Sequence, residues 1–474
     1  MQLWQQFNQW FPHLWVGICA FWAINIVLLS GWVVLQKREA AATLSWLFAL
    51  AFLPLIGFVI YHFLGPQRVR RQQSKRLRSK ASLGKLTRSD SHDASQSALS
   101  LVCEASSGLA ASSAKTAKLL VCGTDCFAAI LEAIGQAKKH IHLEYYIFEP
   151  DTTGTQFRDA LIERATAGVK VRLLLDAIGS ANVGKAFLKP LIQAGAEVAF
   201  FHRTHIRWRG LWKPNINLRS HRKIVVIDSL IGFTGGINIT DDENGAVNKT
   251  PYRDLHIAVT GDVVRWLQLA FLEDWVYSGK HLPKDADLLA PQPQAKIKAQ
   301  IIPAGPDSPL ESIHRAFVFA ITHAQTRVWL ATPYFVPSEA SRMAIVSAAL
   351  RGLDVRLIVP AKSDSRLVDA AAHSYFDEML AAGVHIHSCP YMLHTKALLV
   401  DDETIILGSA NFDNRSFRLN FELCILLENS QLAAALETVL QDDMKKSKKV
   451  PKLRVQPFLS RLAEAFARLL SPLL

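Results

Sequence analysis

The sequence has little cysteine, and this scarcity argues against stabilisation by disulfide bonds or by a structural zinc ion. Only 6 of the 474 residues are cysteines. Cys122 and Cys126 alone lie close together, and no second pair or nearby histidine completes a set of zinc ligands. A zinc site is therefore not expected, and we interpret the cysteines as reduced thiols, in keeping with a protein that faces the cytosol.

Charge is absent from two long apolar runs near the N-terminus. Residues 14–35 and 44–64 contain no charged side chain. At 1.5 Å per residue, each run is long enough to cross a hydrocarbon core of about 30 Å. Residues 1–14 contain no Lys or Arg, and the second run follows closely, so a cleaved signal peptide is disfavoured. Residues 1–66 are predicted to form a hairpin of two membrane helices.

Cations flank the predicted hairpin unequally. The turn between the runs carries Lys37 and Arg38, whereas a larger cluster follows the second run: Arg68, Arg70, Arg71, Lys75, Arg76, Arg78 and Lys80. The larger cluster is expected to stay on the cytoplasmic side, with everything that follows it, and it can rest on anionic lipid headgroups. The formal net charge of +12 also indicates an anionic partner, either a membrane surface, a phosphorylated substrate or nucleic acid.

Beyond the hairpin, the chain reads as an internal repeat. Residues 67–118 are basic and then rich in Ser and Ala, and we interpret them as a mostly flexible linker. Two regions of alternating strand and helix patterns follow, at 119–282 and 301–474, with a connector at 283–300. The order of the patterns matches between them, which predicts an α/β fold, duplicated, with largely parallel strand pairing.

The first repeat carries an insertion. Gly195 and Gly383 occupy matched positions 188 residues apart, whereas His221 and His394 are 173 residues apart, so about fifteen extra residues precede His221. The insertion mixes cations with tryptophan: Arg207, Trp208, Arg209, Trp212 and Lys213. That mixture suits a lipid headgroup zone, and an ordinary solvated loop is the alternative.

One short motif occurs in both repeats, as HRKIVVID from His221 and HTKALLVD from His394. Each apolar run is typical of a buried strand, on which residues two apart point to the same face. His221 is therefore expected to project with Lys223, and His394 with Lys396. A nucleophile or proton donor beside a fixed positive charge suits attack on a phosphodiester.

The acidic residue of each motif fits a different role. Asp228 and Asp401 each lie five positions beyond the motif lysine, so each faces away from that lysine on a regular strand. We interpret both as structural residues that close the strand end.

Small and polar residues follow both motifs at equivalent positions. The sequences GFTGGIN and ILGSAN supply candidate substrate-binding residues, because small residues let backbone amides approach an anion and an Asn amide adds a donor. These candidates are Gly235, Gly236, Asn238, Gly408, Ser409 and Asn411. Asp254 and Glu422 lie farther on and can orient each imidazole through its other nitrogen.

The paired motifs resemble the phospholipase D superfamily, whose defining mark is two such sequences. The resemblance implies two phospholipase D-like domains packed about a pseudo-twofold axis after the hairpin, with the motifs joined in one active site. The resemblance implies that the catalytic residues are His221, Lys223, Asp228, His394, Lys396 and Asp401. It also implies that His221 forms a covalent phosphohistidine, that His394 protonates the leaving alcohol, and that no metal takes part. The near symmetry leaves the order of the two histidines open.

Within that superfamily, the chain looks like the bacterial cardiolipin synthases. The hairpin, TPYFVP and GSANFDNRSFRLNFEL carry this likeness. It implies transfer of a phosphatidyl group from one phosphatidylglycerol to another at the cytoplasmic face of the bacterial inner membrane, with release of glycerol. The stretch ITDDENGAVNKTPYRDLH after GGIN departs from the acidic-aromatic pattern expected there. A hydrolase acting on phospholipid is the alternative. A nuclease is disfavoured because the chain contains two apolar runs and lacks a separate basic binding module.

The C-terminal stretch has apolar residues at helical spacing. Phe458, Leu462, Phe466, Leu469 and Leu470 alternate with arginines. Such a helix can dock on a membrane or close the core of the second repeat, and we favour the core.

Overall fold

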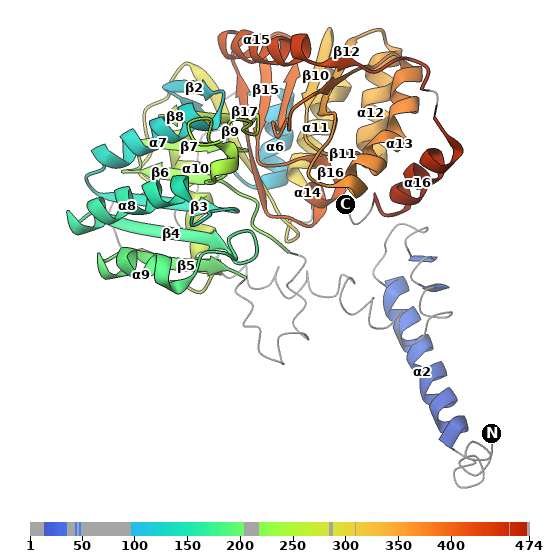
Figure 1. Ribbon diagram of the computed structural model, residues 1–474, viewed down its shortest axis with the longest axis horizontal. Helices are drawn as coiled ribbons and strands as arrows, with labels where there is room; N and C mark the ends of the chain where they lie inside the picture. Colours follow the sequence, from blue (N-terminus) through green and yellow to red (C-terminus); the bar gives the residue numbers. More distant parts are fainter. Residues whose placement is uncertain are drawn as a thin grey trace. The chain divides into compact units, whose positions relative to one another are not determined.

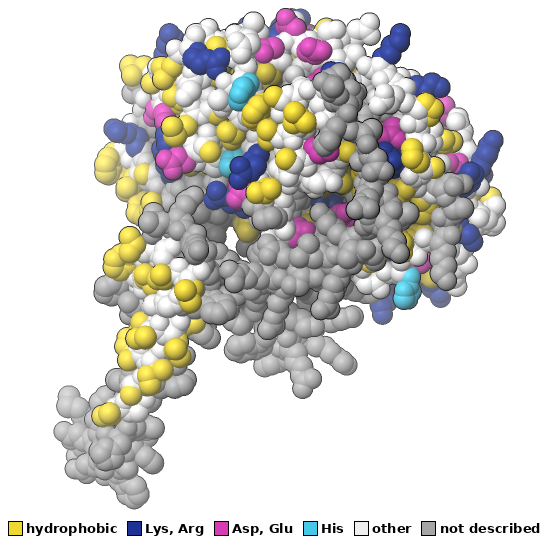
Figure 2. Space-filling view, turned by 180° about the vertical axis from the view of Figure 1, so that it is seen from behind, with side chains coloured by type: hydrophobic (Ala, Val, Ile, Leu, Met, Phe, Trp, Pro, Cys, Tyr) yellow, Lys and Arg dark blue, Asp and Glu magenta, His cyan; other side chains and the backbone are white. Residues whose placement is uncertain are grey.

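The computed structural model describes residues 14–35, 43–44, 47–48, 96–202, 218–283, 288–308, 310–454 and 456–471. The chain divides into two units, one of residues 1–71 with 206–217 and the other of residues 72–205 with 218–474. In the first unit, α2 (Leu14–Leu35) coincides with the first predicted apolar run, and hydrophobic side chains line its surface (Figure 2). Among the described residues, no helix combines the length and the apolar character that a membrane crossing requires. Most of the second run, the basic cluster after it and the tryptophan-containing insertion lie outside the described residues.

The second unit contains two large sheets with the same strand order, which agrees with the predicted duplication. The first sheet runs β2 (Thr116–Leu120), β8 (His256–Thr260), β7 (Ile231–Gly235), β6 (Ile224–Ile227), β3 (His140–Tyr145), β4 (Lys170–Asp176) and β5 (Glu197–Phe201). The matching strands of the second are β9 (Ile297–Ala304), β17 (Glu422–Glu428), β15 (Thr404–Gly408), β14 (Ala397–Val400), β10 (Arg327–Ala331), β12 (Asp354–Pro360) and β13 (His385–Cys389). Short strands β1 (Ser112–Ala114) and β18 (Lys448–Lys449) extend the second sheet at its edges, and β11 (Phe335–Val336) pairs with β16 (Phe412–Asp413).

The prediction of largely parallel pairing was wrong. In each sheet only the last three strands, β3–β4–β5 and β10–β12–β13, pair in parallel, and the remaining pairs among the seven matched strands are antiparallel. Three-residue turns join β6 to β7 and β14 to β15, and connections this short permit only antiparallel neighbours. Both sheets are therefore mixed.

Helices cover the outer faces of both sheets and fill the space between them (Figure 1). One outer layer consists of α7 (Gly123–Gln136), α8 (Thr152–Thr166) and α9 (Lys185–Gln193). The other consists of α6 (Ala98–Ser107), α11 (Ser312–His323), α12 (Glu339–Leu350) and α13 (Arg366–Ala382). Between the sheets, α10 (Val263–Tyr277) and α15 (Ser430–Lys446) contribute to one shared apolar core. That shared core holds the two halves against each other.

Two corrections concern the predicted linker and the C-terminal stretch. The linker extends into ordered structure, because α6, β1 and the start of β2 all lie within residues 98–118. Ser and Ala fit there because α6 is capped by the Ser97 hydroxyl and buries only one face. The C-terminal helix α16 (Phe458–Leu469) does not close the core, since its large apolar side chains are exposed. The short helices α14 (Asn414–Arg418) and η3 (Asp241–Glu243) complete the described elements of this unit.

Candidate active site

Each motif begins just before a central strand and is joined through its backbone to the opposite half. The backbone N–H of His221 donates to the carbonyl of Phe421 over 2.8 Å, and that of His394 donates to the carbonyl of Arg253 over 2.7 Å. The preceding residues form isolated bridges across the same boundary, Ser220 with Phe421 and Leu393 with Arg253. The two motifs are therefore brought to one place by backbone contacts between the halves.

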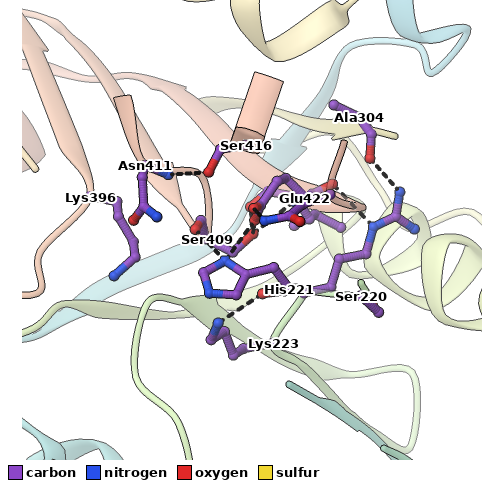
Figure 3. Close-up of polar contacts among 12 residues, drawn as sticks. Ser220, His221, Lys223, Ala304, Lys396, Ser409, Asn411, Ser416 and Glu422 are labelled. Atoms are coloured by element: carbon purple, nitrogen blue, oxygen red, sulfur yellow. Dashed lines mark hydrogen bonds and ion pairs between the residues drawn. The ribbon is translucent and has the colours of Figure 1, made fainter. Parts of the chain in front are cut away.

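The imidazole of His221 contacts a carboxylate of the second half. Its Nδ1 lies 3.0 Å from Oε2 of Glu422 and 3.0 Å from the carbonyl oxygen of Ser409 (Figure 3). Glu422 is fully buried and is held in place by the Ser409 hydroxyl at 2.5 Å and the Asn420 amide at 3.1 Å. Burial alone would raise the pKa of Glu422, but His221, Lys223 and Ser409 lower it below its usual value. Glu422 is thus an ionised acceptor.

The imidazole of His394 has the reciprocal partner. Its Nδ1 lies 2.6 Å from Oδ2 of Asp254, which belongs to the first half. Burial favours the neutral acid, but Lys396 and His394 outweigh it and hold the pKa of Asp254 below its usual value. The sequence predicted Asp254 and Glu422 as orienting carboxylates, and the structure brings each to a histidine of the other half.

These contacts fix which ring nitrogen is reactive. Both partners of His221 Nδ1 are acceptors, so Nδ1 carries the proton and Nε2 keeps its lone pair, and the same holds for His394 beside Asp254. Burial lowers the pKa of His221, and burial together with Lys396 lowers that of His394 to about 4. Each histidine is therefore a neutral imidazole at rest that presents Nε2.

Two buried lysines stand beside the histidines. Lys223 donates to the carbonyl of His221 over 2.8 Å, and Lys396 donates to the carbonyl of His394 and lies 3.4 Å from Oδ2 of Asp254. Burial and then the charge of Lys396 lower the pKa of Lys223 to about 7, and burial also lowers the pKa of Lys396. Two ammonium groups close enough to repel each other form a site that favours an anion.

Each motif aspartate lies at the end of its strand that is remote from the motif histidine. Asp228 accepts backbone N–H bonds from Lys138, Lys139 and His140, over 2.7–2.8 Å. Asp401 accepts the equivalent bonds from residues 325–327 at the start of β10. Both residues have φ above +50°, in the left-handed region. These contacts fit the interpretation of both as residues that close a strand end, and none of them is made with His221 or His394.

The small residues after each motif serve close packing of the backbone. A Cβ on Gly235 would lie 2.5 Å from the carbonyl oxygen of Leu255, and one on Gly408 would lie 2.3 Å from that of Leu423. A Cβ on Gly236 would meet the Asp254 carboxylate at 2.3 Å. Glycine is therefore required here to let the neighbouring strand, or its carboxylate, approach.

The two asparagines occupy matched turns with one difference between them. The backbone N–H of Asn238 donates to Oε1 of Glu243 over 3.0 Å, and that of Asn411 donates to the hydroxyl of Ser416 over 3.2 Å. The partner lies five residues on in both halves, yet it is a carboxyl in the first and a hydroxyl in the second. The Asn238 amide also donates to Glu243, whereas Oδ1 of Asn411 is buried and accepts no hydrogen bond from the part of the chain that the structure describes.

Sequence reasoning missed Glu243. Its side chain is buried beside Asp254, and burial followed by the charge of Asp254 raises its pKa to about 8. It follows the GGIN turn within the stretch that departs from the expected pattern, so the equal spacing of Asn238–Glu243 and Asn411–Ser416 is a signal that could have found it. The site is thus less symmetric than its two motifs.

Arg222 and Tyr146 were also missed. Arg222 is buried and forms an ion pair with Asp274 at 2.5 Å, while it donates to the carbonyls of Glu422 and Ala304 in the second half. The ring of Tyr146 lies edge-on to that of His221, with 4.8 Å between centroids. Arg222, the residue that follows His221 in the chain, links the two halves next to the motif. Tyr146 limits the freedom of the His221 ring.

One buried group among the described residues offers oxygen and nitrogen atoms close enough to share a cation. These atoms belong to Glu243, Asp254 and His394 and lie within 4.8 Å of one another. The ammonium group of Lys396 already lies against Asp254, and Glu243 has a raised pKa that favours its neutral form. The carboxylate charge is balanced by protein cations, so these residues do not fit a divalent ion well.

Comparisons with known proteins agree with this geometry. A family model described as "Cardiolipin synthase, PLD-like domain" matches residues 130–275 and 318–444. Cardiolipin synthase 1 of Bacillus anthracis is 36% identical over 490 residues, which cover 98% of this chain and 96% of that protein. Cardiolipin synthase of Geobacillus kaustophilus is 35% identical over 473 residues, which cover 95% and 92%.

A solved structure shares the fold. The crystal structure of phosphatidylserine synthase from Haemophilus influenzae aligns with a TM-score of 0.60 at 16% identity, and the alignment covers 79% of this chain and 100% of that chain. At this identity the similarity concerns the fold alone.

Proposed function

The chain belongs to the cardiolipin synthase family with phospholipase D-like domains, and we propose that it makes cardiolipin from two molecules of phosphatidylglycerol with release of glycerol. One observation carries the proposal: two neutral histidines, each oriented by a carboxylate of the other half, flank a pair of buried lysines. A double displacement at phosphorus needs one nucleophile and one acid–base group, and this site offers both.

The first displacement uses the free Nε2 of His221. It attacks the phosphorus of the first phosphatidylglycerol, and the phosphorus–oxygen bond to the glycerol headgroup breaks. The departing oxygen takes a proton from Nε2 of His394, and the phosphatidyl group stays on His221 as a phosphohistidine. Lys223 and Lys396 hold the nonbridging oxygens, whose negative charge also raises the pKa of His394 toward the protonated form that this step requires.

The second displacement reverses the proton transfer. A glycerol hydroxyl of the second phosphatidylglycerol gives its proton to Nε2 of His394 and attacks the phosphorus. The phosphorus–nitrogen bond to His221 breaks, which yields cardiolipin, restores the neutral imidazole of His221 and leaves His394 protonated. His394 then releases that proton to solvent as the anionic product departs and its pKa returns to about 4. Water gives phosphatidic acid at the same step, so transfer depends on lipid reaching the site in preference to water.

We also propose that the N-terminal residues hold the enzyme at the bacterial inner membrane, with both halves on the cytoplasmic side. The continuous apolar sequence of α2 and the cations after the second apolar run support this arrangement. Anionic membrane lipid is then both the substrate and the surface that the enzyme contacts.

The test uses purified full-length protein with labelled phosphatidylglycerol in the presence of EDTA. We expect equimolar cardiolipin and glycerol from the parent protein, none from His221→Ala, and parent activity from His323→Ala, which changes an exposed histidine. Phosphatidic acid without cardiolipin would replace the proposal with a phospholipase. Complete loss of activity with EDTA and recovery with a divalent ion would overturn the metal-independent mechanism.

A further inference from the structure

The C-terminal helix α16 carries a continuous apolar stripe that faces away from the protein. Six large side chains are between 41% and 75% exposed: Phe458, Leu459, Leu462, Phe466, Leu469 and Leu470. On a helix with 3.6 residues per turn, they fall within about 120° of one another. Single exposed apolar residues are ordinary, but a stripe of this width along three turns is not.

The opposite face of α16 lies against the domain through buried Ala467, which joins the apolar core, and through polar contacts. Glu464 is buried and accepts from Arg454 over 2.8 Å and from Gln456 over 2.7 Å. The guanidinium group of Arg468 lies 4.4 Å from the ring centroid of Tyr375 in α13. This orientation is the reverse of a surface helix in a globular protein, which buries its apolar side.

Polar contacts also fix the end of the helix. The hydroxyl of Tyr375 donates to that of Ser471 over 2.9 Å, and the Asn414 amide donates to the carbonyl of Ser471 over 3.2 Å. Asn414 begins α14, which follows β16 and is separated by that short strand from Asn411. The apolar stripe is thus held in a defined orientation against the second half.

Exposed cations precede α16. Lys445, Lys446, Lys448, Lys449 and Lys452 are all exposed within eight residues. An outward apolar stripe that follows a cationic segment in the chain is the pattern of a helix that lies in a membrane interface with anionic lipid. A purely apolar protein partner would match the stripe but would leave these cations without complementary charge.

We propose that α16 docks in the plane of the membrane, with Phe458, Leu462 and Phe466 in the acyl-headgroup boundary and the preceding lysines on anionic headgroups. The occupant of this face is the surface of an anionic phospholipid bilayer. Docking holds the second half at the lipid surface from which substrate comes. This contact does not depend on the reaction that the site performs, so it can fail or succeed independently of the proposed function.

The test measures lipid contact by fluorescence quenching, a readout that does not depend on turnover. Full-length protein, with Cys19 and Cys122 changed to serine, receives a single environment-sensitive fluorophore (NBD) through Phe466→Cys. The matched control is Leu350→Cys, at a 70% exposed apolar position at the end of α12. Both are reconstituted in vesicles of phosphatidylglycerol and phosphatidylcholine, with or without doxyl-labelled acyl chains. We expect at least about twofold quenching at position 466 and almost none at position 350.

Two results would overturn the proposal. Absence of quenching at position 466 would place the stripe in water or against protein, and crosslinking between Phe466→Cys chains would then identify a second copy as the occupant. Equal quenching at both positions would mean that the domain adsorbs without using α16.

A second variant connects docking with activity. Leu462→Glu combined with Phe466→Glu puts charge on exposed positions, so the fold should be retained. We expect about a tenfold lower rate with phosphatidylglycerol in vesicles and an unchanged rate with the same lipid dispersed in detergent micelles. Equal losses in both systems would contradict a docking role.

Discussion

Glu422 of the second half lies 3.0 Å from Nδ1 of His221 in the first half, and among the described residues neither forms a carboxylate–histidine pair within its own half. Asp254 and His394 repeat the arrangement in the opposite direction. Each half therefore supplies one histidine and the carboxylate that orients the other. A working site requires both halves in register, which the shared core around α10 and α15 provides.

The exchanged carboxylate is expected to control the tautomer of the nucleophile. Glu422→Gln keeps the size of the side chain but lets its amide donate toward Nδ1, which favours the wrong tautomer. We expect kcat for cardiolipin formation to fall by about 10²- to 10⁴-fold with a small change in KM. Glu428→Gln, at the other end of the same strand β17, is the control and should keep parent activity. A loss below about threefold for Glu422→Gln would show that orientation by this carboxylate is unimportant.

The pKa of Glu243 makes a prediction about pH. At about 8, this pKa leaves Glu243 neutral at pH 7, and Gln reproduces the neutral form and can still accept from Asn238. We expect Glu243→Gln to keep activity within about twofold of the parent below pH 7. Above pH 8 both proteins lose the ammonium form of Lys223, but the parent should lose more activity than the variant, because only the parent has a carboxyl at position 243 that ionises beside Asp254. Profiles of kcat/KM between pH 6 and 9 measure this, and a variant that is impaired at every pH would show that the carboxyl itself is required.

Binding of anions should weaken above neutral pH. Burial and Lys396 lower the pKa of Lys223 to about 7, so its ammonium form is lost as pH rises through that value. We expect the affinity for tungstate, a phosphate analogue, to fall by up to about tenfold per pH unit above pH 7, measured by calorimetry on the resting protein. Lys223→Gln should bind weakly with a flatter pH dependence, and Lys445→Ala, at an exposed position, should behave like the parent.

The free energy of unfolding should also depend on the ionisation of Lys223, but it should rise with pH where the affinity for anions falls. The unfolded chain keeps Lys223 protonated up to its ordinary pKa of 10.5, so between about pH 7 and 10.5 it binds more protons than the folded chain. The contribution of Lys223 to stability therefore rises with pH in that window. Replacement by Met should raise the thermal midpoint most at or below pH 7, and a constant difference between pH 7 and 10 would contradict the lowered pKa.

Arg222 should carry much of the contact between the halves. Arg222→Met leaves Asp274 buried without its cation, and breaking a buried pair in this way costs about 3–5 kcal/mol. The thermal midpoint in detergent should fall by several degrees, and Arg222→Met with Asp274→Leu should recover part of the loss. Lys445→Ala removes an exposed ion pair with Asp442 and should have almost no effect. A double variant as unstable as the single one would place the cost in the lost carbonyl contacts instead.

The sequence by itself determined the duplication, the two motifs and the carboxylates Asp254 and Glu422, because each follows from residue types at repeated spacings. The helix ends at Gly195 and Gly383 were also predictable, since both adopt a positive φ that favours glycine. Local pattern does not specify which strands pair across short turns, however, so the antiparallel majority in both sheets was missed.

Only the tertiary structure decided the exchange of carboxylates between the halves, because that depends on how two separately patterned domains meet. The same limit applies to Glu243, whose raised pKa comes from burial beside a residue eleven positions away. It applies most clearly to α16. Periodicity showed that one side of this helix is apolar, but the contacts of Glu464 and Arg468 with the domain decided that the apolar side faces outward.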